Sequence, residues 1–149
     1  VGDHDYIPAV AESLGAERLL WKVAQKPGMP LYVARQGSTL LFGLPGNPAS
    51  VLVNLMVYVR ALLDTLQGLD AARRWYPAPA TLTVKRDVEK TLWLRAVQSI
   101  DAQGQISLHA LPNQGSHMLG NLASANALLR VPPANTQGES SAISWCALQ

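Results

Sequence analysis

The chain has 149 residues, of which 48% are hydrophobic and 15% are charged, whereas a typical soluble domain has about 25% charged residues. This composition excludes an intrinsically disordered segment, which needs low hydrophobicity and a high net charge. The 12 Lys and Arg residues against 10 Asp and Glu residues give a net charge of +2, and the basic residues are scattered, so we expect no nucleic-acid partner. The length suits one domain or two small domains, and the excess of apolar residues predicts that an interface covers part of the surface.

Cysteine content and apolar stretches indicate the cellular compartment. Cys146 is the single cysteine, which excludes an internal disulfide and a cysteine-based zinc site and fits a reducing compartment. The most apolar stretch, Val51 to Leu63, is interrupted by Asn54 and Arg60 and is shorter than the roughly 18 apolar residues of a membrane span. Residues 1–15 lack the basic region of a signal peptide. We therefore expect a cytoplasmic protein without membrane contact, and because the chain does not begin with Met it reads as part of a longer protein.

The first half of the chain alternates between helix and strand patterns. The spacing of apolar residues predicts a short helix from Ile7 to Leu14, with Asp5 as its N-cap and Gly15 as its stop. Three strands are then predicted, over Leu19–Ala24, Leu31–Ala34 and Thr39–Phe42. A long helix follows from Pro48 to about Gln67, and because it is apolar on nearly every side we expect it to be buried between layers. These elements predict an α/β unit.

The second half has the pattern of an all-β domain. A connector at residues 71–79 leads into alternating polar and apolar residues over Thr81–Val88. Thr91–Ile100 and Ile106–Ala110 are joined by a turn-forming sequence and predict a hairpin. Further short strands at Leu128–Val131 and Ala142–Ala147 predict a small barrel or sandwich of about five strands.

The loop Gly43-Leu44-Pro45-Gly46-Asn47-Pro48 joins a predicted strand to the long helix. Asn47 is placed as the N-cap and Pro48 at the first helical position, where a missing N–H costs nothing. Free amides at such a helix start, together with the close approach that Gly46 permits, can bind an anion. The alternative is a stiff connection in which Pro45 and Pro48 only set the turn.

Two lysines precede this loop. Lys22 lies within a predicted apolar strand, so either its stem reaches an edge of the sheet or its ammonium meets an anion. Lys26 is held extended by Pro27, and Gly28 allows a tight turn that presents the amine to a ligand. The alternative for Lys26 is an ordinary solvated lysine.

Acidic residues near the start of the chain are candidates for a metal site. Asp3 and Asp5 could hold Mg²⁺ against a phosphate, since this ion is commonly bound by one or two carboxylates and substrate oxygens. The alternative is that Asp5 only caps the first helix and Asp3 favours its dipole. The three histidines are too dispersed to suggest a metal cluster.

Two further polar residues lie in the second half. Arg95 lies inside a strand and forms either a structural salt bridge or a planar fork for a doubly bonded oxyanion. Ser116, in the segment Gln114-Gly115-Ser116, precedes a predicted short helix and either caps that helix or binds an oxyanion.

Four segments in this order resemble the motifs of the molybdopterin molybdenumtransferase family, also called the MoeA family, which includes the gephyrin E domain. The segments are Gly2–Tyr6, Trp21-Lys22 with Lys26–Pro30, Gly43–Pro48 and Gln114–Ser116. The resemblance covers the whole chain and implies two parts. Residues 1–72 would be the last part of a three-layer, MogA-like molybdopterin-binding α/β domain, and residues 73–149 a small barrel-like C-terminal β domain.

The resemblance implies insertion of molybdate into adenylated molybdopterin with release of AMP, assisted by Mg²⁺ or another divalent cation. It also implies a homodimer and makes a molybdopterin adenylyltransferase a candidate partner. Matched residue by residue, it implies catalytic roles for Asp5, Lys22 and Lys26, a metal site at Asp3 and Asp5, and substrate binding by Pro45, Gly46, Asn47, Pro48, Arg95 and Ser116.

The chain departs from the family pattern in two respects. A Gly-Gly-x-Ser segment is absent, and Met29 stands where bacterial members often have Lys, so we expect about half of an active site. One alternative is a non-catalytic, gephyrin-like scaffold that binds proteins. A second is a relative of the α/β unit alone, such as a molybdopterin adenylyltransferase or a competence-damage-type domain, which would lack the β domain.

Overall fold

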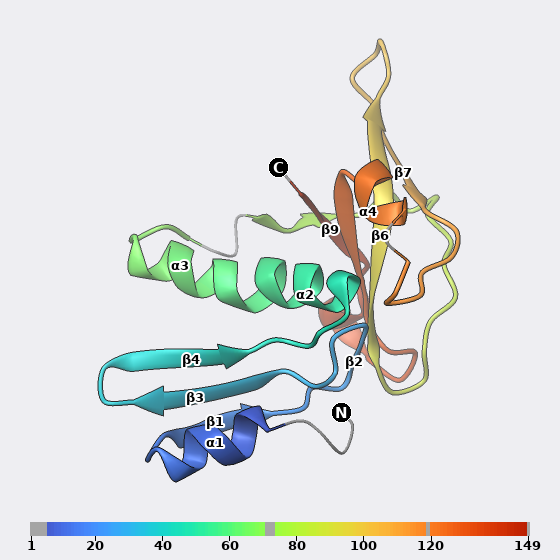
Figure 1. The fold of residues 1–149 in the computed structure, drawn as a ribbon. Coiled ribbons are helices and arrows are strands. Elements are labelled where there is room, and N and C mark those ends of the chain that lie inside the picture. Colours follow the sequence, from blue (N-terminus) through green and yellow to red (C-terminus); the bar gives the residue numbers. More distant parts are fainter. Residues whose placement is uncertain (1–5, 71–73, 119, 149) are drawn as a thin grey trace.

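The computed structural model describes residues 6–70, 74–118 and 120–148, which form two adjoining parts (Figure 1). The first part holds helix α1 (Ile7–Ser13) and the strands β1 (Glu17–Trp21), β3 (Tyr32–Gln36) and β4 (Thr39–Gly43). These strands form an antiparallel sheet in the order β1-β3-β4. Ala11 and Leu41 pack against a buried cluster of Ala16, Tyr32 and Ala34, which fixes α1 on one face of the sheet.

One continuous helix leads from this sheet toward the second part. It consists of α2 (Pro48–Asn54), the π-helical segment η1 (Leu55–Val59) and α3 (Arg60–Leu66). In the view of Figure 1, this helix and α1 flank the three strands on opposite sides.

The second part is a six-stranded sheet with the order β2-β6-β8-β9-β5, in which β7 also pairs with β6. Its elements are β2 (Gln25–Lys26), β5 (Tyr76–Pro77), β6 (Thr91–Ile100), β7 (Ile106–Ala110), α4 (Gly120–Ser124), β8 (Ala127–Val131), η3 (Gly138–Ser141) and β9 (Ser144–Ala147). Strand β2 comes from the connection between β1 and β3 and pairs in parallel with β6, Gln25 with Thr91 and Lys26 with Leu92. A loop of the first part thus becomes an edge of the second sheet.

The two faces of the second sheet bury different residues. Ala96, Leu129 and Val131 belong to a core within the β part. The other face carries Trp93, Leu128 and Cys146, which form a cluster with Val53 of α2. Because Val53 belongs to the first part, the predicted division at residues 72 and 73 crosses a shared core. Burial raises the pKa of the Cys146 thiol to about 11, so this cysteine is protonated and unreactive at neutral pH.

Several predicted elements are confirmed, and others differ. The hairpin of β6 and β7 forms as predicted, with the Asp101 carboxylate accepting the backbone N–H groups of Gln103 and Gln105 in its turn. The predicted strand over Thr81–Val88 is wrong. Leu82 and Val84 do pack on the core, but the backbone N–H of Leu82 donates to Pro79, inside a local turn. The alternation therefore reflects the partial burial of Leu82 and Val84 without a strand partner, while Val88 is exposed.

The long helix differs from its prediction in two ways. Pro48–Leu66 is 19 residues long and, by length and composition alone, is long and apolar enough to cross a membrane, so the expectation of a stretch too short for this was wrong. The expected burial on nearly every side was also wrong, because Leu55, Leu63 and Leu66 are exposed. Its buried polar residues Asn54 and Asp64 bond to groups of other elements, as in a helix packed against protein.

Asp64 fastens the end of this helix to the chain that follows it. The carboxylate is buried and pairs with Arg60 Nε at 2.9 Å and with Arg74 Nε at 2.5 Å. Burial by itself would raise the pKa of Asp64, but the hydrogen bonds and charges of the two arginines outweigh it and hold the pKa below its usual value. The ionised form is therefore the one that the folded chain stabilises.

We expect this carboxylate to make the stability of the chain sensitive to acid. A carboxyl group with a lowered folded-state pKa contributes stability above its unfolded-state pKa of about 3.9 and loses that contribution as the pH falls through the folded-state pKa. Asp64→Asn should therefore lower the urea midpoint at pH 7, and the difference from the unsubstituted chain should shrink as the pH falls below 4. The exposed Glu139 provides the control Glu139→Gln. If Asp64→Asn lowers the urea midpoint equally at pH 7 and below pH 4, this role of Asp64 is contradicted.

Candidate functional site

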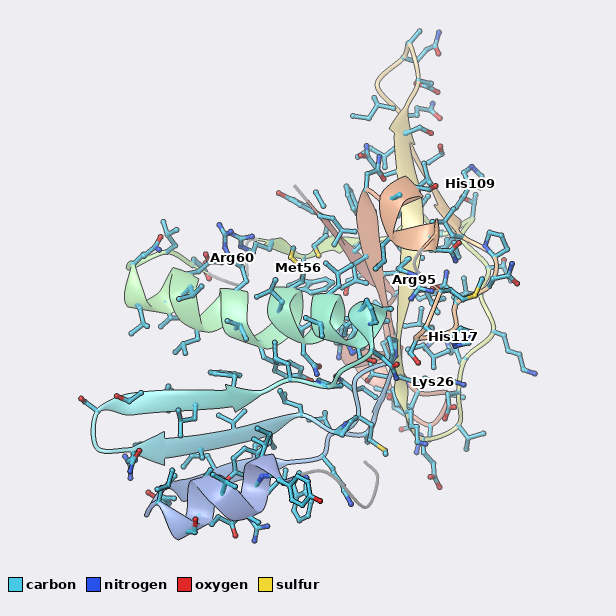
Figure 2. The ribbon with its side chains drawn as sticks, in the orientation of Figure 1. Lys26, Met56, Arg60, Arg95, His109 and His117 are labelled. Carbon is cyan, nitrogen blue, oxygen red and sulfur yellow. The ribbon has the colours of Figure 1, made fainter. Side chains whose placement is uncertain are left out.

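A cavity of about 270 Å³ lies at the junction of the two parts. Figure 2 shows Lys26 below Arg95 along the line of β6, with the first turn of α2 beside them. Four segments far apart in the sequence line the cavity: Gln25–Pro30, the loop and first turn around α2 with Pro45, Asn47 and Ser50, Lys90 before β6, and Gln114 with Ser116. The parallel pairing of β2 with β6 and the packing of α2 on the sheet bring these segments together.

The structure gathers four of the predicted site residues in this cavity: Lys26, Pro45, Asn47 and Ser116. Gly46 and Pro48 flank Asn47 but do not line the cavity. Asp3 and Asp5 lie outside the described residues. Their role as metal ligands and the catalytic role of Asp5 stay predictions. Among residues 6–70, 74–118 and 120–148 no group of three or more His, Cys, Asp or Glu side chains could hold a metal ion.

Lys22 occupies a different setting from the one predicted. Strand β1 ends at Trp21, and Lys22 is exposed with its Nζ 4.8 Å from the centroid of the Trp21 ring. The backbone of Lys22 is left-handed, with φ of 66°, a conformation that costs a residue other than glycine about 1–2 kcal/mol. The prediction that Lys22 lies inside an apolar strand was therefore wrong, because this backbone conformation stops the strand. Its catalytic role stays a prediction.

Helix α2 begins at the predicted position, but the hydrogen bonding of its first turn differs from the prediction. Asn47 is the N-cap residue, and its side chain makes no capping hydrogen bond and lines the cavity. The amides of Ser50 and Val51 donate to the Asn47 carbonyl, and the amide of Ala49 donates to the Ser116 carbonyl at 3.4 Å. The expectation of free amides at these three positions was wrong because the chain itself satisfies them. The Asn47 side chain therefore remains available to a ligand in the cavity.

A buried hydrogen-bond network holds Lys26 in place through its neighbour Gln25. The Gln25 amide donates to the Gly28 carbonyl at 3.0 Å and to Asn54 Oδ1 at 2.8 Å. Its oxygen accepts the Tyr58 hydroxyl at 2.6 Å and the Trp93 indole N–H at 2.9 Å. Every polar atom of this buried side chain is thus bonded, which fixes the loop that carries Lys26 to both α2 and β6.

The same network explains why a glycine follows Pro27. Gly28 has φ of 90°, and a Cβ at this position would lie 2.8 Å from Asn54 Oδ1 and 3.0 Å from Gln25 Nε2. A side chain here would push the network apart, so the close approach requires glycine. The sequence patterns single out neither Gln25 nor Asn54 as a site residue, although Asn54 interrupts an otherwise apolar helical stretch and so indicates a polar role.

Arg95 lies directly behind the cavity wall. Its side chain is fully buried, and its Nη2 donates to the carbonyls of Asn113 at 3.3 Å and Gly115 at 3.1 Å. Gly115 stands between Gln114 and Ser116, which line the cavity. The Gln114 side chain accepts the Arg95 backbone N–H at 2.9 Å and donates to the Arg95 carbonyl at 2.8 Å, so the loop is clamped onto β6.

The guanidinium of Arg95 keeps unused donors. Its Nε and Nη1 atoms are buried and have no hydrogen-bond partner in the described chain. The alternative of a structural salt bridge was wrong, since no carboxylate of the described residues pairs with it. Burial lowers the pKa of Arg95, but an arginine remains charged in proteins. A buried cation with unpaired N–H groups is costly, and an anion at this position would supply the missing acceptors.

Ser116 does not cap a helix. Helix α4 begins only at Gly120, and Ser116 lies in a turn in which the Met118 N–H donates to the Gly115 carbonyl. The predicted short helix forms as α4 but begins later than predicted, so the alternative that Ser116 caps it was wrong. The part-buried Ser116 side chain lines the cavity instead.

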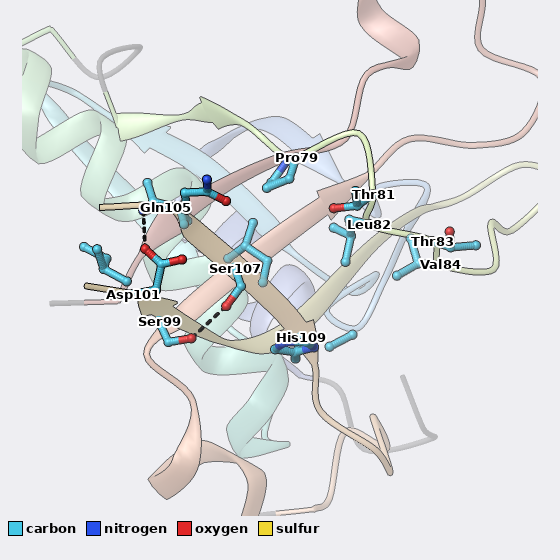
Figure 3. Close-up of a pocket in the computed structure, with 14 residues that line it drawn as sticks. Pro79, Thr81, Leu82, Thr83, Val84, Ser99, Asp101, Gln105, Ser107 and His109 are labelled. Carbon is cyan, nitrogen blue, oxygen red and sulfur yellow. Dashed lines mark hydrogen bonds between the residues drawn. The ribbon is translucent and has the colours of Figure 1, made fainter. Parts of the chain in front are cut away.

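A larger cavity, of about 710 Å³, lies between residues 79–84 and the hairpin of β6 and β7 (Figure 3). The Ser99 and Ser107 hydroxyls are 2.7 Å apart at its edge, and the Asp101 carboxylate accepts the Gln105 N–H. Among the described residues, no lysine or arginine lines it. The smaller junction cavity has two lysines in its wall and Arg95 behind it, so it is the better candidate for an anionic ligand.

Comparisons with known proteins define the class of the two parts. Residues 1–65 match the family described as "Probable molybdopterin binding domain", and residues 77–142 match "MoeA C-terminal region (domain IV)". A molybdopterin-binding domain is thus followed by a MoeA-type C-terminal region. The chain belongs to the molybdopterin molybdenumtransferase, or MoeA, family, which confirms the resemblance of its motifs.

The relatives are much longer than the chain. A molybdopterin molybdenumtransferase from Haemophilus influenzae is 34% identical over 134 residues, which are 87% of this chain and 32% of the relative. One from Bacillus subtilis is 34% identical over 142 residues, with 93% of this chain and 32% of the relative covered. The crystal structure of a molybdopterin biosynthesis moeA protein from Pyrococcus horikoshii shares the fold with a TM-score of 0.63 at 19% identity, over 100% of this chain and 40% of that one. The chain therefore spans about a third of the length of these curated relatives.

Proposed function

We propose that this chain belongs to a molybdopterin molybdenumtransferase that inserts molybdate into adenylated molybdopterin and releases AMP. The observation that carries the proposal is the junction cavity, where Lys26, Asn47 and Ser116 meet in front of a buried arginine with unused donors. Family membership supports the same activity. We propose the finer architecture on the same grounds: a MogA-like three-layer unit followed by a barrel-like domain.

The donors around the cavity suit the substrates of this reaction. Molybdate and the phosphates of adenylated molybdopterin are oxyanions, which need several hydrogen-bond donors and positive charge. Lys26 supplies an ammonium, Asn47 an amide and Ser116 a hydroxyl, while Arg95 holds a cationic fork behind Ser116. Donors fixed in advance by the fold stabilise charge that develops as the phosphate leaves. The reaction then requires no nucleophilic side chain from this chain.

The cavity accounts for only part of a complete site. Its volume of about 270 Å³ holds an oxyanion but is small for a ligand that also carries a pterin and a nucleotide. We propose that Lys22, Asp5, Gly46 and Pro48 contribute further contacts, that Asp3 and Asp5 bind Mg²⁺ or another divalent cation, and that a homodimer completes the site. We further propose a cytoplasmic location, and a molybdopterin adenylyltransferase as the source of the adenylated substrate.

Release of AMP tests this function. The complete gene product that contains this chain would be supplied with adenylated molybdopterin, molybdate and a divalent cation. We expect AMP release that depends on molybdate. No molybdate-dependent release from a folded protein would overturn the enzyme and leave the gephyrin-like scaffold as the function to pursue.

Lys26 should contribute strongly to this reaction. A charged hydrogen bond is worth about 1.5–3 kcal/mol, so Lys26→Gln should lower molybdate-dependent AMP release about tenfold to a hundredfold. Lys26→Arg keeps the charge and should retain more of the activity. Because Lys26 is exposed on its outer side, neither substitution should change the unfolding midpoint much. Activity of Lys26→Gln within about twofold of the unsubstituted protein, or ~0.4 kcal/mol, would show that Lys26 is an ordinary solvated lysine.

A further inference from the structure

A second lysine, absent from the residues predicted from sequence, lies in the wall of the junction cavity. Lys90 is part-buried and directly precedes β6. The Asp87 carboxylate accepts the backbone N–H groups of Glu89 and Lys90, each at 3.0 Å, and so shapes the turn that leads into the strand. The next residue, Thr91, donates its N–H to the Ala24 carbonyl at 3.0 Å. The backbone of Lys90 is thus fixed against the segment that carries Lys26.

The ammonium of Lys90 is not used by the fold. Within the described residues it makes no hydrogen bond and no direct ion pair. The backbone hydrogen bonds that Asp87 accepts lower the pKa of its carboxyl group, and the nearby charges of Lys90 and Lys26 lower this pKa further. Two lysine residues therefore line one small cavity, and Asp87, a carboxylate near both within the described residues, pairs directly with neither.

We propose that Lys90 binds a tetrahedral oxyanion of the substrates together with Lys26. Two like charges at one cavity repel each other unless a ligand carries the opposite charge, and a doubly charged oxyanion satisfies both. Lys26 lies on β2, the strand that the first part contributes to the second sheet, and Lys90 directly precedes its partner strand β6, so one bound anion would contact both strands. This inference rests on the proposed function, with molybdate and the substrate phosphate as the two sources of such an anion.

The test uses Lys90→Gln in the complete gene product, with Lys90→Arg as the conservative variant. Lys85→Gln is the matched control, since Lys85 is exposed on the same segment and does not line the cavity. We expect Lys90→Gln to raise the concentration for half-maximal AMP release tenfold or more for one substrate. A rise for molybdate identifies molybdate as the anion, and a rise for adenylated molybdopterin identifies its phosphate. Lys90→Arg should recover most of the loss, and Lys85→Gln should match the unsubstituted protein.

If Lys90→Gln leaves the concentration for half-maximal AMP release unchanged for both substrates, the proposed role of Lys90 is overturned. The same holds if Lys90→Gln only lowers the unfolding midpoint, which would make Lys90 a counterion of Asp87. If the unsubstituted protein releases no AMP, the proposed function fails. The role of Lys90 in anion binding is then tested by the equilibrium binding of molybdate and of inorganic phosphate. At least tenfold weaker binding by Lys90→Gln would support its role, whereas equal binding, or none by the unsubstituted protein, would overturn it. If Lys90→Gln does not fold, Lys90→Met replaces it in the same comparison.

Discussion

Replacing Arg95 with Met should lower molybdate-dependent AMP release by a hundredfold or more. Two buried nitrogen atoms of the Arg95 guanidinium, Nε and Nη1, have no partner in the described chain and lie behind the loop that lines the junction cavity. Two charged hydrogen bonds to an oxyanion would contribute about 3–6 kcal/mol, which corresponds to more than two orders of magnitude in rate. Arg95→Lys keeps the charge but loses the planar fork, and we expect it to stay at least tenfold below the unsubstituted protein.

The stability of the Arg95→Met variant separates a binding role from a structural one. Within the described residues the guanidinium bonds only to the carbonyls of Asn113 and Gly115, and replacing it removes a buried cation with unpaired donors, whose desolvation is costly. We therefore expect the free energy of unfolding to change by less than about 2 kcal/mol. A large loss of stability with full activity in the folded fraction would show that Arg95 only holds the loop.

Replacing Gln25 with Glu should destabilise the chain by about 3 kcal/mol or more. The substitution removes the two N–H groups that donate to the Gly28 carbonyl and to Asn54 Oδ1, and places a second oxygen against these acceptors. It also introduces a carboxyl group at a position that is 2% exposed. Buried acceptors without donors and a buried carboxylate both carry large desolvation costs.

Tyr58→Phe provides the matched control for Gln25→Glu. It removes one hydrogen bond to the Gln25 oxygen and leaves the Trp93 N–H in place, so the expected loss is about 1 kcal/mol. Urea unfolding of both variants measures the difference. A loss below about 1 kcal/mol for Gln25→Glu would mean that the network does not fix the loop that carries Lys26.

The sequence predicts local elements better than the contacts between distant ones. The hairpin of β6 and β7 follows from alternating residues and a turn rich in hydrogen-bonding side chains. Strand β2 has only two residues, and its partner β6 lies far along the chain, so no local pattern indicates it. The alternation over Thr81–Val88 fails for a related reason, because a period of two indicates part-buried side chains such as Leu82 and Val84 but not whether a neighbouring strand is available.

The same distinction holds for the site. Lys26, Asn47 and Ser116 belong to short motifs and could be identified before their proximity was known. Lys90 belongs to no motif and, by sequence, looks like an ordinary solvated residue before a strand; only the pairing of β2 with β6 places it at the cavity. The unused donors of Arg95 also depend on the fold, because they follow from the loop that covers its strand.

Diffraction from crystals of the protein soaked with tungstate tests the site most directly. Tungstate has the shape and charge of molybdate, and its metal atom is located by anomalous scattering. We expect one tungstate in the junction cavity, with oxygens within hydrogen-bond distance of Lys26 and Ser116 and with Arg95 behind the wall. An empty junction cavity in a crystal that binds tungstate elsewhere would contradict the assignment of this cavity as the oxyanion site.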